Sequence, residues 1–241
     1  MAADLALEVS GISCIFGGVR ALDGLDLTVA HGETRCVIGP NGAGKTTFLN
    51  VVCGLVRPST GRVVAGGRDI TGSSPVRIAR HGIIRSFQTP TVFAGLPIAV
   101  NLELGARRPG APTSGTAERV EAMLAELGYA DRAAMPAGAL SQGERKRLEL
   151  GMMLLAGPSI LLLDEPTAGM TVRETDEIVN LLKRLTADIT VVVIEHDMSF
   201  VRQIADRVSV LHRGALLTEG SVTDVQNDPR VQDVYLGTGV H

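Results

Sequence analysis

The chain has 241 residues, which is enough for one or two domains and a large hydrophobic core. Hydrophobic residues make up 45% of it and charged residues 20%, which excludes an extensively disordered chain and a disulfide-dependent scaffold. The 23 Lys and Arg residues against 26 Asp and Glu residues give a net charge of −3. The strongly basic character of a nucleic-acid binder is missing, so we expect no nucleic-acid partner.

Apolar runs and cysteines indicate the compartment. The longest apolar runs, such as residues 160–163 and 191–194, fall far short of the roughly 20 residues that span a bilayer. Residues 1–8 lack the basic start and apolar run of a secretory signal. We therefore expect a cytosolic chain without a transmembrane segment. The three cysteines lack paired metal spacing, suit a reducing compartment and are expected to be small core residues: Cys14, Cys36 and Cys53.

Strand patterns and turns open the chain. Residues 5–15 and 25–29 are predicted strands. A β-branched segment at 36–38 then runs into a glycine-rich loop, and the apolar residues from Phe48 onward have helical spacing. Short strands are predicted again at 63–71. The first part of the chain is therefore predicted as β structure that contains one strand, glycine loop and helix unit.

From about residue 78 to residue 155 the pattern is mostly helical, which implies a second subdomain. Its clearest predicted helix spans 118–127. Beyond the subdomain, short apolar runs at 160–163 and 189–194 flank a helical pattern at 172–185, as expected for buried parallel strands joined by a crossover. The sequence therefore predicts an α/β core that is interrupted by a helical insertion.

Residues 39–46 match the P-loop pattern of a glycine, four residues, a glycine, a lysine and a serine or threonine. Gly42 and Gly44 let the backbone curl so that its amide hydrogens and the helix N-terminus face a phosphate. Lys45 is expected to reach the β and γ oxygens, and Thr46 to hold magnesium. The alternative, a merely tight strand-to-helix turn, does not require a lysine followed by two threonines.

An acidic pair ends the apolar run at 160–163. Asp164 and Glu165 lie at the carboxyl end of a predicted buried strand, the edge at which open α/β sheets bind ligands. Because this edge meets the P-loop, we expect Asp164 to serve magnesium and Glu165 to orient and polarise the attacking water. The second effect is typically worth about 10² to 10⁴ in rate. Taken alone, the pair also fits an ordinary strand end.

A Leu-Ser-x-Gly segment around Ser141 precedes a helix predicted at 143–156. Ser141 and Glu144 fit a capping box, which by itself explains both residues. The P-loop, this helix start and the Asp-Glu strand end together resemble, in this order, the ATP-binding cassette (ABC) family. The family usually has glycine at the position of Gln142 and glutamine at that of Glu144. Because a carboxylate aimed at a phosphate would repel it, we expect Glu144 to turn back as the cap.

The resemblance covers nearly the whole chain and implies an α/β fold: a P-loop NTPase (RecA-like) core with an N-terminal antiparallel β part and an inserted α-helical subdomain. It implies one ABC ATPase domain, with the nucleotide-binding core at 1–87 and 157–241 and the signature subdomain at 88–156. The implied activity is hydrolysis of ATP, with ATP and Mg²⁺ as cofactors. Two subunits, identical or different, are expected to close head to tail on two ATP molecules.

The resemblance also assigns roles to individual residues. The ATP-binding set is Phe16, whose ring would stack on adenine, with Gly39, Pro40, Asn41, Gly42, Ala43, Gly44, Lys45, Thr46 and Thr47. The metal set is Thr46, Gln88 and Asp164. The catalytic set is Glu165, Gln88 and His196, of which His196 is expected to hydrogen-bond the γ-phosphate. The signature set, which would act on the partner's ATP, is Ser141, Gln142 and Gly143.

Each of the weaker assignments has a simpler alternative. Gln88 also fits a solvated loop residue, His196 a hydrogen-bonded histidine at a strand end, and Phe16 a core aromatic. Thr171 departs from the family pattern, because many members place there an Asp that links the two nucleotide sites. Thr171 and Glu174 instead fit a capping box, which gives Thr171 a sufficient local role.

Local segments most resemble the ATPases of branched-chain amino acid and urea importers. These segments include 16–18, 87–93, 168–171 and 234–237. The sequences at 88–90 and 169–171 further resemble those of the urea-transporter subunit. We therefore expect an importer ATPase for urea or a short-chain amide; a branched-chain amino acid importer, a lipid exporter and a non-transport ABC ATPase are the alternatives.

The same resemblance implies the partners and the place of work. The expected partners are a second ATPase subunit, transmembrane permease subunits and, indirectly, a periplasmic solute-binding protein. The expected location is peripheral, at the cytoplasmic face of the inner (plasma) membrane.

Overall fold

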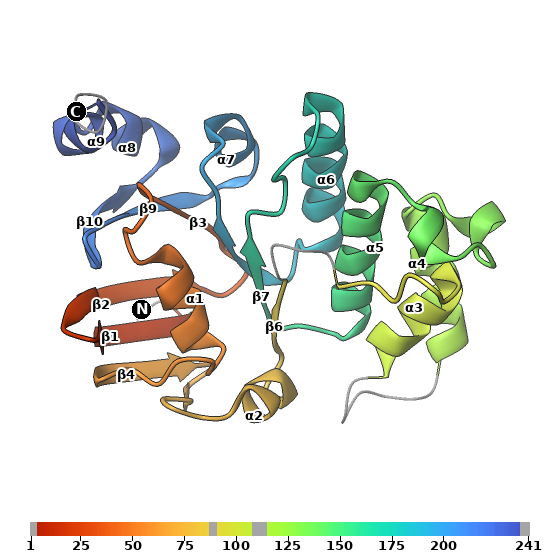
Figure 1. Ribbon diagram of the computed structural model, residues 1–241, viewed down its shortest axis with the longest axis horizontal. Helices are drawn as coiled ribbons and strands as arrows, with labels where there is room; N and C mark the ends of the chain where they lie inside the picture. Colours follow the sequence, from red (N-terminus) through yellow and green to blue (C-terminus); the bar gives the residue numbers. More distant parts are fainter. Residues whose placement is uncertain (1–3, 87–90, 108–114, 237–241) are drawn as a thin grey trace.

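Two β-sheets and a group of helices build the protein in the computed structural model, which describes residues 4–86, 91–107 and 115–236 (Figure 1). One sheet is antiparallel, with the strand order β2 (Val19–Ala30), β1 (Leu5–Phe16), β4 (Thr60–Ala65) and β5 (Arg68–Asp69). The glycines between β1 and β2 have φ angles of 54° and 86°, which allows the tight hairpin turn. The strand predicted at 5–15 is confirmed. The one predicted at 25–29 is only the second half of β2, whose first half pairs with the end of β1.

The six-stranded sheet has the order β10 (Ala215–Gly220), β9 (Arg207–His212), β3 (Thr34–Ile38), β8 (Thr190–Ile194), β7 (Ile160–Asp164) and β6 (Ile83–Arg85). Its strands are parallel except β10. Cys36 and Ile38 of β3 face one hydrophobic core, and Val37 faces the other. Burial on both faces explains why these strands are continuous apolar runs. The prediction of parallel β7 and β8 with a crossover between them is confirmed.

Helices fill the space between the sheets and cover the far face of the six-stranded sheet. Helix α1 (Lys45–Val52) packs between the two sheets, together with Ile78 of α2 (Pro75–Arg80). The other face is covered by α6 (Val172–Leu185), α7 (Met198–Ile204), α8 (Val222–Asn227) and α9 (Pro229–Leu236). All three cysteines are buried free thiols, as predicted. Among the described helices, none is both long enough and apolar enough to span a bilayer.

The remaining helices project to one side of the molecule, at the right in Figure 1. They are α3 (Ile98–Ala106), α4 (Thr116–Glu126) and α5 (Gln142–Leu155), with two 3₁₀ turns at Ala130–Arg132 and Ala137–Ala139. Helices α3 and α5 touch closely, because a Cβ atom on Gly105 would lie 2.4 Å from the carbonyl oxygen of Met152. These helices occupy the stretch in which the sequence predicts a helical subdomain.

The predicted helical start at residue 78 is wrong for residues 83–85. These residues form β6, which pairs in parallel with β7 and extends the six-stranded sheet. Three residues are too few to show an alternating or a helical period, so the strand exists through its tertiary pairing and not through a local pattern. The six-stranded sheet therefore includes residues 83–85, which lie within the nucleotide-binding core expected at 1–87.

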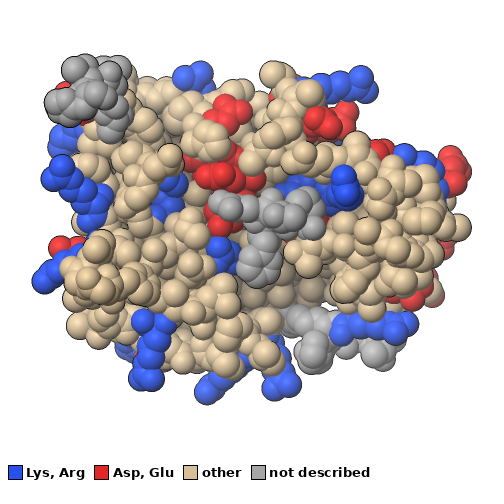
Figure 2. Space-filling model, viewed as in Figure 1, with Lys and Arg blue, Asp and Glu red and all other residues tan. Residues whose placement is uncertain are grey.

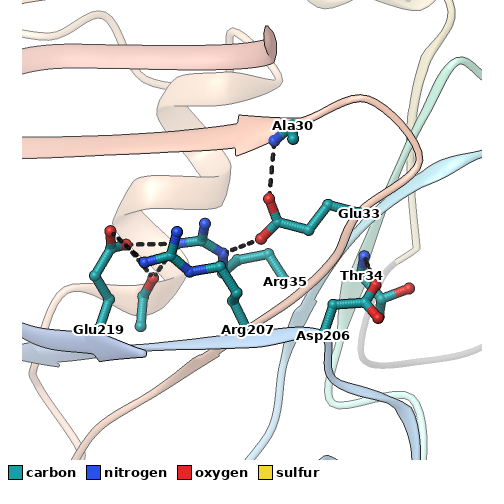
Figure 3. Close-up of polar contacts among 8 residues, drawn as sticks. Ala30, Glu33, Thr34, Arg35, Asp206, Arg207 and Glu219 are labelled. Atoms are coloured by element: carbon teal, nitrogen blue, oxygen red, sulfur yellow. Dashed lines mark hydrogen bonds and ion pairs between the residues drawn. The ribbon is translucent and has the colours of Figure 1, made fainter. Parts of the chain in front are cut away.

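A buried charged network ties the two sheets together at the amino ends of the parallel strands (Figure 3). Arg35 of β3 is 1% exposed and bonds the carboxylates of Glu33 and Glu219 and the hydroxyl of Ser209. The other oxygen of Glu33 accepts from the Ala30 amide at the end of β2 at 2.9 Å. A buried charge needs such partners, because leaving water uncompensated costs several kcal/mol. The network therefore fixes β2, β3, β9 and β10 relative to one another.

Candidate nucleotide site

The P-loop connects β3 to α1, and close backbone contacts require two of its glycines. Gly39 has φ +148°, and a Cβ atom there would lie 2.2 Å from the carbonyl oxygen of Leu211 in β9. Gly44, which precedes α1, has φ +103°, and its Cβ would lie 2.6 Å from the carbonyl oxygen of Ala21 in β2. Any side chain at either position would displace the loop. The fold of two neighbouring strands therefore sets the shape of the loop.

The loop lines a cavity of about 390 Å³. Residues 19–21 of β2 and Glu165, which directly follows β7, complete its wall. The loop and first helical turn contribute Asn41, Gly42, Ala43, Gly44, Lys45, Thr46 and Thr47. The structure thus brings residues 41–47 of the predicted ATP-binding set and the predicted catalytic acid into one cavity.

Three predicted ATP-binding residues lie outside this lining. Gly39 and Pro40 instead present their carbonyl oxygens to the Lys45 ammonium, at 2.6 and 3.0 Å. Phe16 is paired with the lining residue Val19 across the β1–β2 hairpin and is 49% exposed. The alternative that Phe16 is a core aromatic is therefore wrong, and Phe16 lies opposite a residue of the cavity wall in the hairpin.

Lys45 is the cation that the loop itself contributes to the cavity, whereas Arg20, from β2, also lines it and pairs with Asp23. Burial lowers the pKa of the Lys45 ammonium, while the carboxylates of Glu165 and Asp164 act in the opposite direction. The ammonium is therefore partly shielded from water by its surroundings and is attracted by the two carboxylates at the end of β7. Figure 2 shows acidic side chains gathered near the middle of this face, over the region where Figure 1 shows β7 and α7, with basic side chains on both sides.

Glu165 has an unusual backbone conformation. Its φ is +46°, in the left-handed region that non-glycine residues rarely adopt and that costs of order 1 kcal/mol or more. Its amide donates to the carbonyl oxygen of Ile194 at the end of β8 at 3.0 Å, which holds the turn in place. Strain of this kind persists where the surrounding structure enforces it and is concentrated at functional sites. The turn leaves the Glu165 carboxylate on the cavity wall.

Asp164 has one oxygen in use and one without a partner. Its Oδ2 accepts from Arg85 Nη2 at 2.8 Å, and its amide donates to the Ser86 hydroxyl at 3.1 Å. Its Oδ1 is buried and has no hydrogen-bond partner within the described part of the chain. An unsatisfied buried carboxylate oxygen is costly, and Mg²⁺ binds through one or two carboxylates while keeping several waters. Thr46 lines the cavity, and Asp164, which is not itself a lining residue, directly precedes the lining residue Glu165. The hydroxyl and carboxylate oxygens of Thr46 and Asp164 are of the kind that fits magnesium.

Glu195 connects the two loops that carry Glu165 and His196, a role that the sequence analysis missed. It is 1% exposed and accepts from the amide and hydroxyl of Thr167 at 3.2 and 2.6 Å. Its other oxygen accepts from the amides of His196 and Asp197 at 3.0 and 3.3 Å. His196 Nδ1 then lies 3.8 Å from Oε1 of Glu165. The sequence feature that could have pointed to Glu195 is its position as an acidic residue directly after a predicted buried strand.

The predicted signature residues lie at the start of α5. Ser141 is the N-cap, and Glu144 completes a capping box, so the prediction that Glu144 turns back is confirmed. Burial raises the pKa of Glu144, but hydrogen bonds from Ser141 and Arg132 outweigh it and leave the pKa below its ordinary value. Gly143 packs against the Glu174 side chain of α6. Neither Ser141, Gln142 nor Gly143 is among the residues that line the P-loop cavity of the same chain.

Two other regions bear on the site. Thr171 and Glu174 form the predicted capping box of α6, which is confirmed.

Tyr235 of α9 belongs to the segment 234–237, which resembles the importer branch. Burial raises the pKa of its phenol, whereas a hydrogen bond with the Gly39 backbone lowers it. The last described helix therefore reaches the first residue of the P-loop. Gln88, predicted for metal and water, lies outside the described residues.

Known proteins are similar to this chain in sequence and in fold. The sequence pattern of the family described as ABC transporter matches residues 22–168, and that of the branched-chain amino acid ATP-binding cassette transporter matches residues 215–241. The high-affinity branched-chain amino acid transport ATP-binding protein BraF of Pseudomonas aeruginosa is 36% identical, over 96% of this chain and 97% of its own. LivG of Escherichia coli K12 is 33% identical over the same shares. The methionine import ATP-binding protein MetN of Leifsonia xyli is 37% identical, over 96% of this chain and 71% of its own.

Solved structures show the same architecture. The ADP conformation of MJ1267, an ATP-binding cassette of an ABC transporter, matches with a TM-score of 0.86 at 32% identity and covers 97% of this chain and 99% of that chain. The fold and the P-loop cavity therefore define an ABC ATPase, as the sequence predicted. The chain belongs to the ABC transporter ATP-binding family, whose ATPase domain binds ATP or ADP.

Proposed function

We propose that this chain is the ATP-hydrolysing subunit of an ABC importer and couples ATP hydrolysis to solute uptake. The observation that carries the proposal is the single cavity shared by the P-loop and Glu165. The names of BraF, LivG and MetN refer to amino-acid transport or import, which favours an importer over a lipid exporter or a non-transport ATPase. The pattern matched at 215–241 favours branched-chain amino acids as the solute class.

The proposed chemistry assigns each residue of the cavity a task. The amides of residues 41–47 bind the triphosphate, and Lys45 exchanges its loop carbonyl partners for the β and γ oxygens. Glu165 orients and polarises the attacking water, and His196 binds the γ-phosphate from the neighbouring loop. Thr46, Asp164 and Gln88 would hold Mg²⁺, which supplies charge neutralisation for the phosphate oxygens.

A second subunit would complete the site. Residues 141–143 do not line the cavity of their own chain, although the helix N-terminus that they form is suited to an anion. We assign them to the ATP held by the P-loop of a partner ATPase, identical or different. Closure and reopening of this pair would drive the permease subunits, at the cytoplasmic face of the membrane, and a periplasmic solute-binding protein would act through the permease. Differential nucleotide affinity for the two states supplies the bias.

Urea or a short-chain amide is the second candidate solute. It is favoured by the sequence Gly169-Met170-Thr171, which resembles the corresponding segment of the urea-transporter subunit. In the structure this segment lies beside the signature, since Gly169 approaches the Gln142 side chain and Thr171 caps α6. Its contacts are with the signature segment and the start of α6, so the resemblance indicates a relationship to the urea-transporter subunit and says nothing about how a solute is recognised.

Uptake by cells tests the function and separates the two solutes. Deletion of the gene is expected to abolish uptake of labelled leucine and to leave labelled urea uptake unchanged. Re-expression of the wild-type chain is expected to restore leucine uptake, and the Glu165→Gln variant is expected not to. Loss of urea uptake alone would favour the second candidate, and unchanged uptake of both solutes would contradict the proposed importer function.

A further inference from the structure

Arg85 is a buried cation at the edge of the site, and no role has been assigned to it. It is the last residue of β6, and its side chain is 7% exposed. Its Nη1 donates to the Asn50 side chain of α1, and its Nη2 donates to Asp164 Oδ2 at 2.8 Å. Arg85 therefore connects the P-loop helix to the strand that ends in Asp164.

The occupancy of the Asp164 carboxylate distinguishes this ion pair from a structural one. In the Arg35 network, both oxygens of each carboxylate have donors: Glu33 bonds Arg35 and the Ala30 amide, and Glu219 bonds Arg35 and Arg207. Asp164 bonds Arg85 through Oδ2, whereas its buried Oδ1 has no hydrogen-bond partner among the described residues. Leaving that oxygen unpaired costs free energy, which a bound cation or one of its waters would offset.

We propose that Arg85 is a positioning residue for the metal-bound nucleotide. By holding Oδ2 of Asp164, it fixes the rotation of the carboxylate. Oδ1 can then coordinate Mg²⁺ or accept a hydrogen bond from one of its waters. The inference deepens the proposed function and depends on its metal site. Mg²⁺ demands nearly ideal octahedral geometry, so a freely rotating carboxylate would serve it poorly.

The connections of Arg85 explain how the position is held. Its bond to Asn50 anchors the guanidinium on α1, the helix that begins with Lys45 and Thr46. The adjacent Ser86 hydroxyl accepts from the Asp164 amide, so β6 fixes both the backbone and the side chain of Asp164. Planar, two-armed bridging of this kind is specific to arginine, because lysine offers a single ammonium.

Binding measurements with two matched substitutions test the proposal. ATP is titrated calorimetrically into wild type, Arg85→Lys and Arg35→Lys, in EDTA and over a series of Mg²⁺ concentrations. Outer-shell partners of metal ligands typically contribute about 10- to 100-fold in metal affinity. We expect Arg85→Lys to raise the Mg²⁺ concentration needed for half-maximal enhancement by about tenfold, with ATP binding in EDTA unchanged.

Arg35→Lys is the matched control, because it makes the same exchange of a buried arginine at the opposite end of the same sheet. It is expected to lower the unfolding temperature and leave the Mg²⁺ dependence unchanged. A folded Arg85→Lys with the wild-type Mg²⁺ dependence would overturn the proposal. If Arg85→Lys fails to fold, Asn50→Leu, which removes the anchor on α1, must shift the Mg²⁺ dependence in the same direction, and no shift overturns it. A wild type without any Mg²⁺ dependence would instead contradict the proposed metal site.

Discussion

At the scale of single residues, Glu165 has the most direct chemical role in this account. Its carboxylate lines the P-loop cavity, and its strained backbone is held by the end of β8. Glu165→Gln keeps the shape of the side chain but removes its ability to polarise water. We expect ATP binding to persist, hydrolysis to fall by at least about 10² in rate, and a dimer to accumulate with Mg²⁺ and ATP. Phosphate release and gel filtration measure these effects, and wild-type hydrolysis would refute the assignment.

Glu195 is predicted to act through its neighbours. Its four hydrogen bonds join the Thr167 turn to His196, and Gln in its place would turn an amide donor toward one of the two donor pairs. A misplacement of about 1 Å at a catalytic group typically costs about 10² in rate. We expect Glu195→Gln to lower kcat by about this factor with little change in ATP affinity. An equal loss in both quantities would instead indicate general damage to the fold.

At the scale of elements, α5 begins with a capping box whose charge makes it sensitive to pH. The pKa of Glu144 is lowered below its ordinary value of 4.5, so the folded state favours the ionised carboxylate. The stabilisation is therefore complete above 4.5 and is lost as the pH falls through the lower folded pKa. Glu144→Gln is expected to lower the unfolding temperature at pH 7 and to make no difference in strong acid. Thermal unfolding at several pH values measures this, with Glu121→Gln, at an exposed position of α4, as control.

Sequence reasoning succeeded for these elements where the determining contacts are local. The P-loop and the two capping boxes depend on spacings of a few residues, so their positions follow from the sequence. The strand β6 and the partners of Glu195 and Arg85 depend on which segments meet in the folded sheet. For example, Arg85 lies 79 residues from Asp164 along the chain. Nothing in the local pattern around Arg85 identifies that partner, and only the pairing of β6 with β7 brings the two together.

At the scale of the whole molecule, the proposed site needs a second subunit to be complete. Lys45, Glu165 and the threonines line the P-loop cavity, but the predicted signature residues of the same chain are not among its lining residues. We therefore expect the isolated chain to bind ATP well and to hydrolyse it slowly, with a rate that rises steeply with protein concentration or on addition of a partner ATPase. A rate per chain that is independent of concentration would show that the monomer is sufficient.

The central claim is that the cavity between β3, α1 and β7 binds a nucleoside triphosphate. Calorimetric titration of the wild-type chain with ATP and Mg²⁺ tests it most directly, with Lys45→Ala as the paired variant. We expect saturable binding to the wild type and a loss of at least about tenfold in affinity in the variant, because a charged hydrogen-bond donor to phosphate is removed. A folded wild-type chain that binds no ATP, or that binds it as tightly without Lys45, would contradict it.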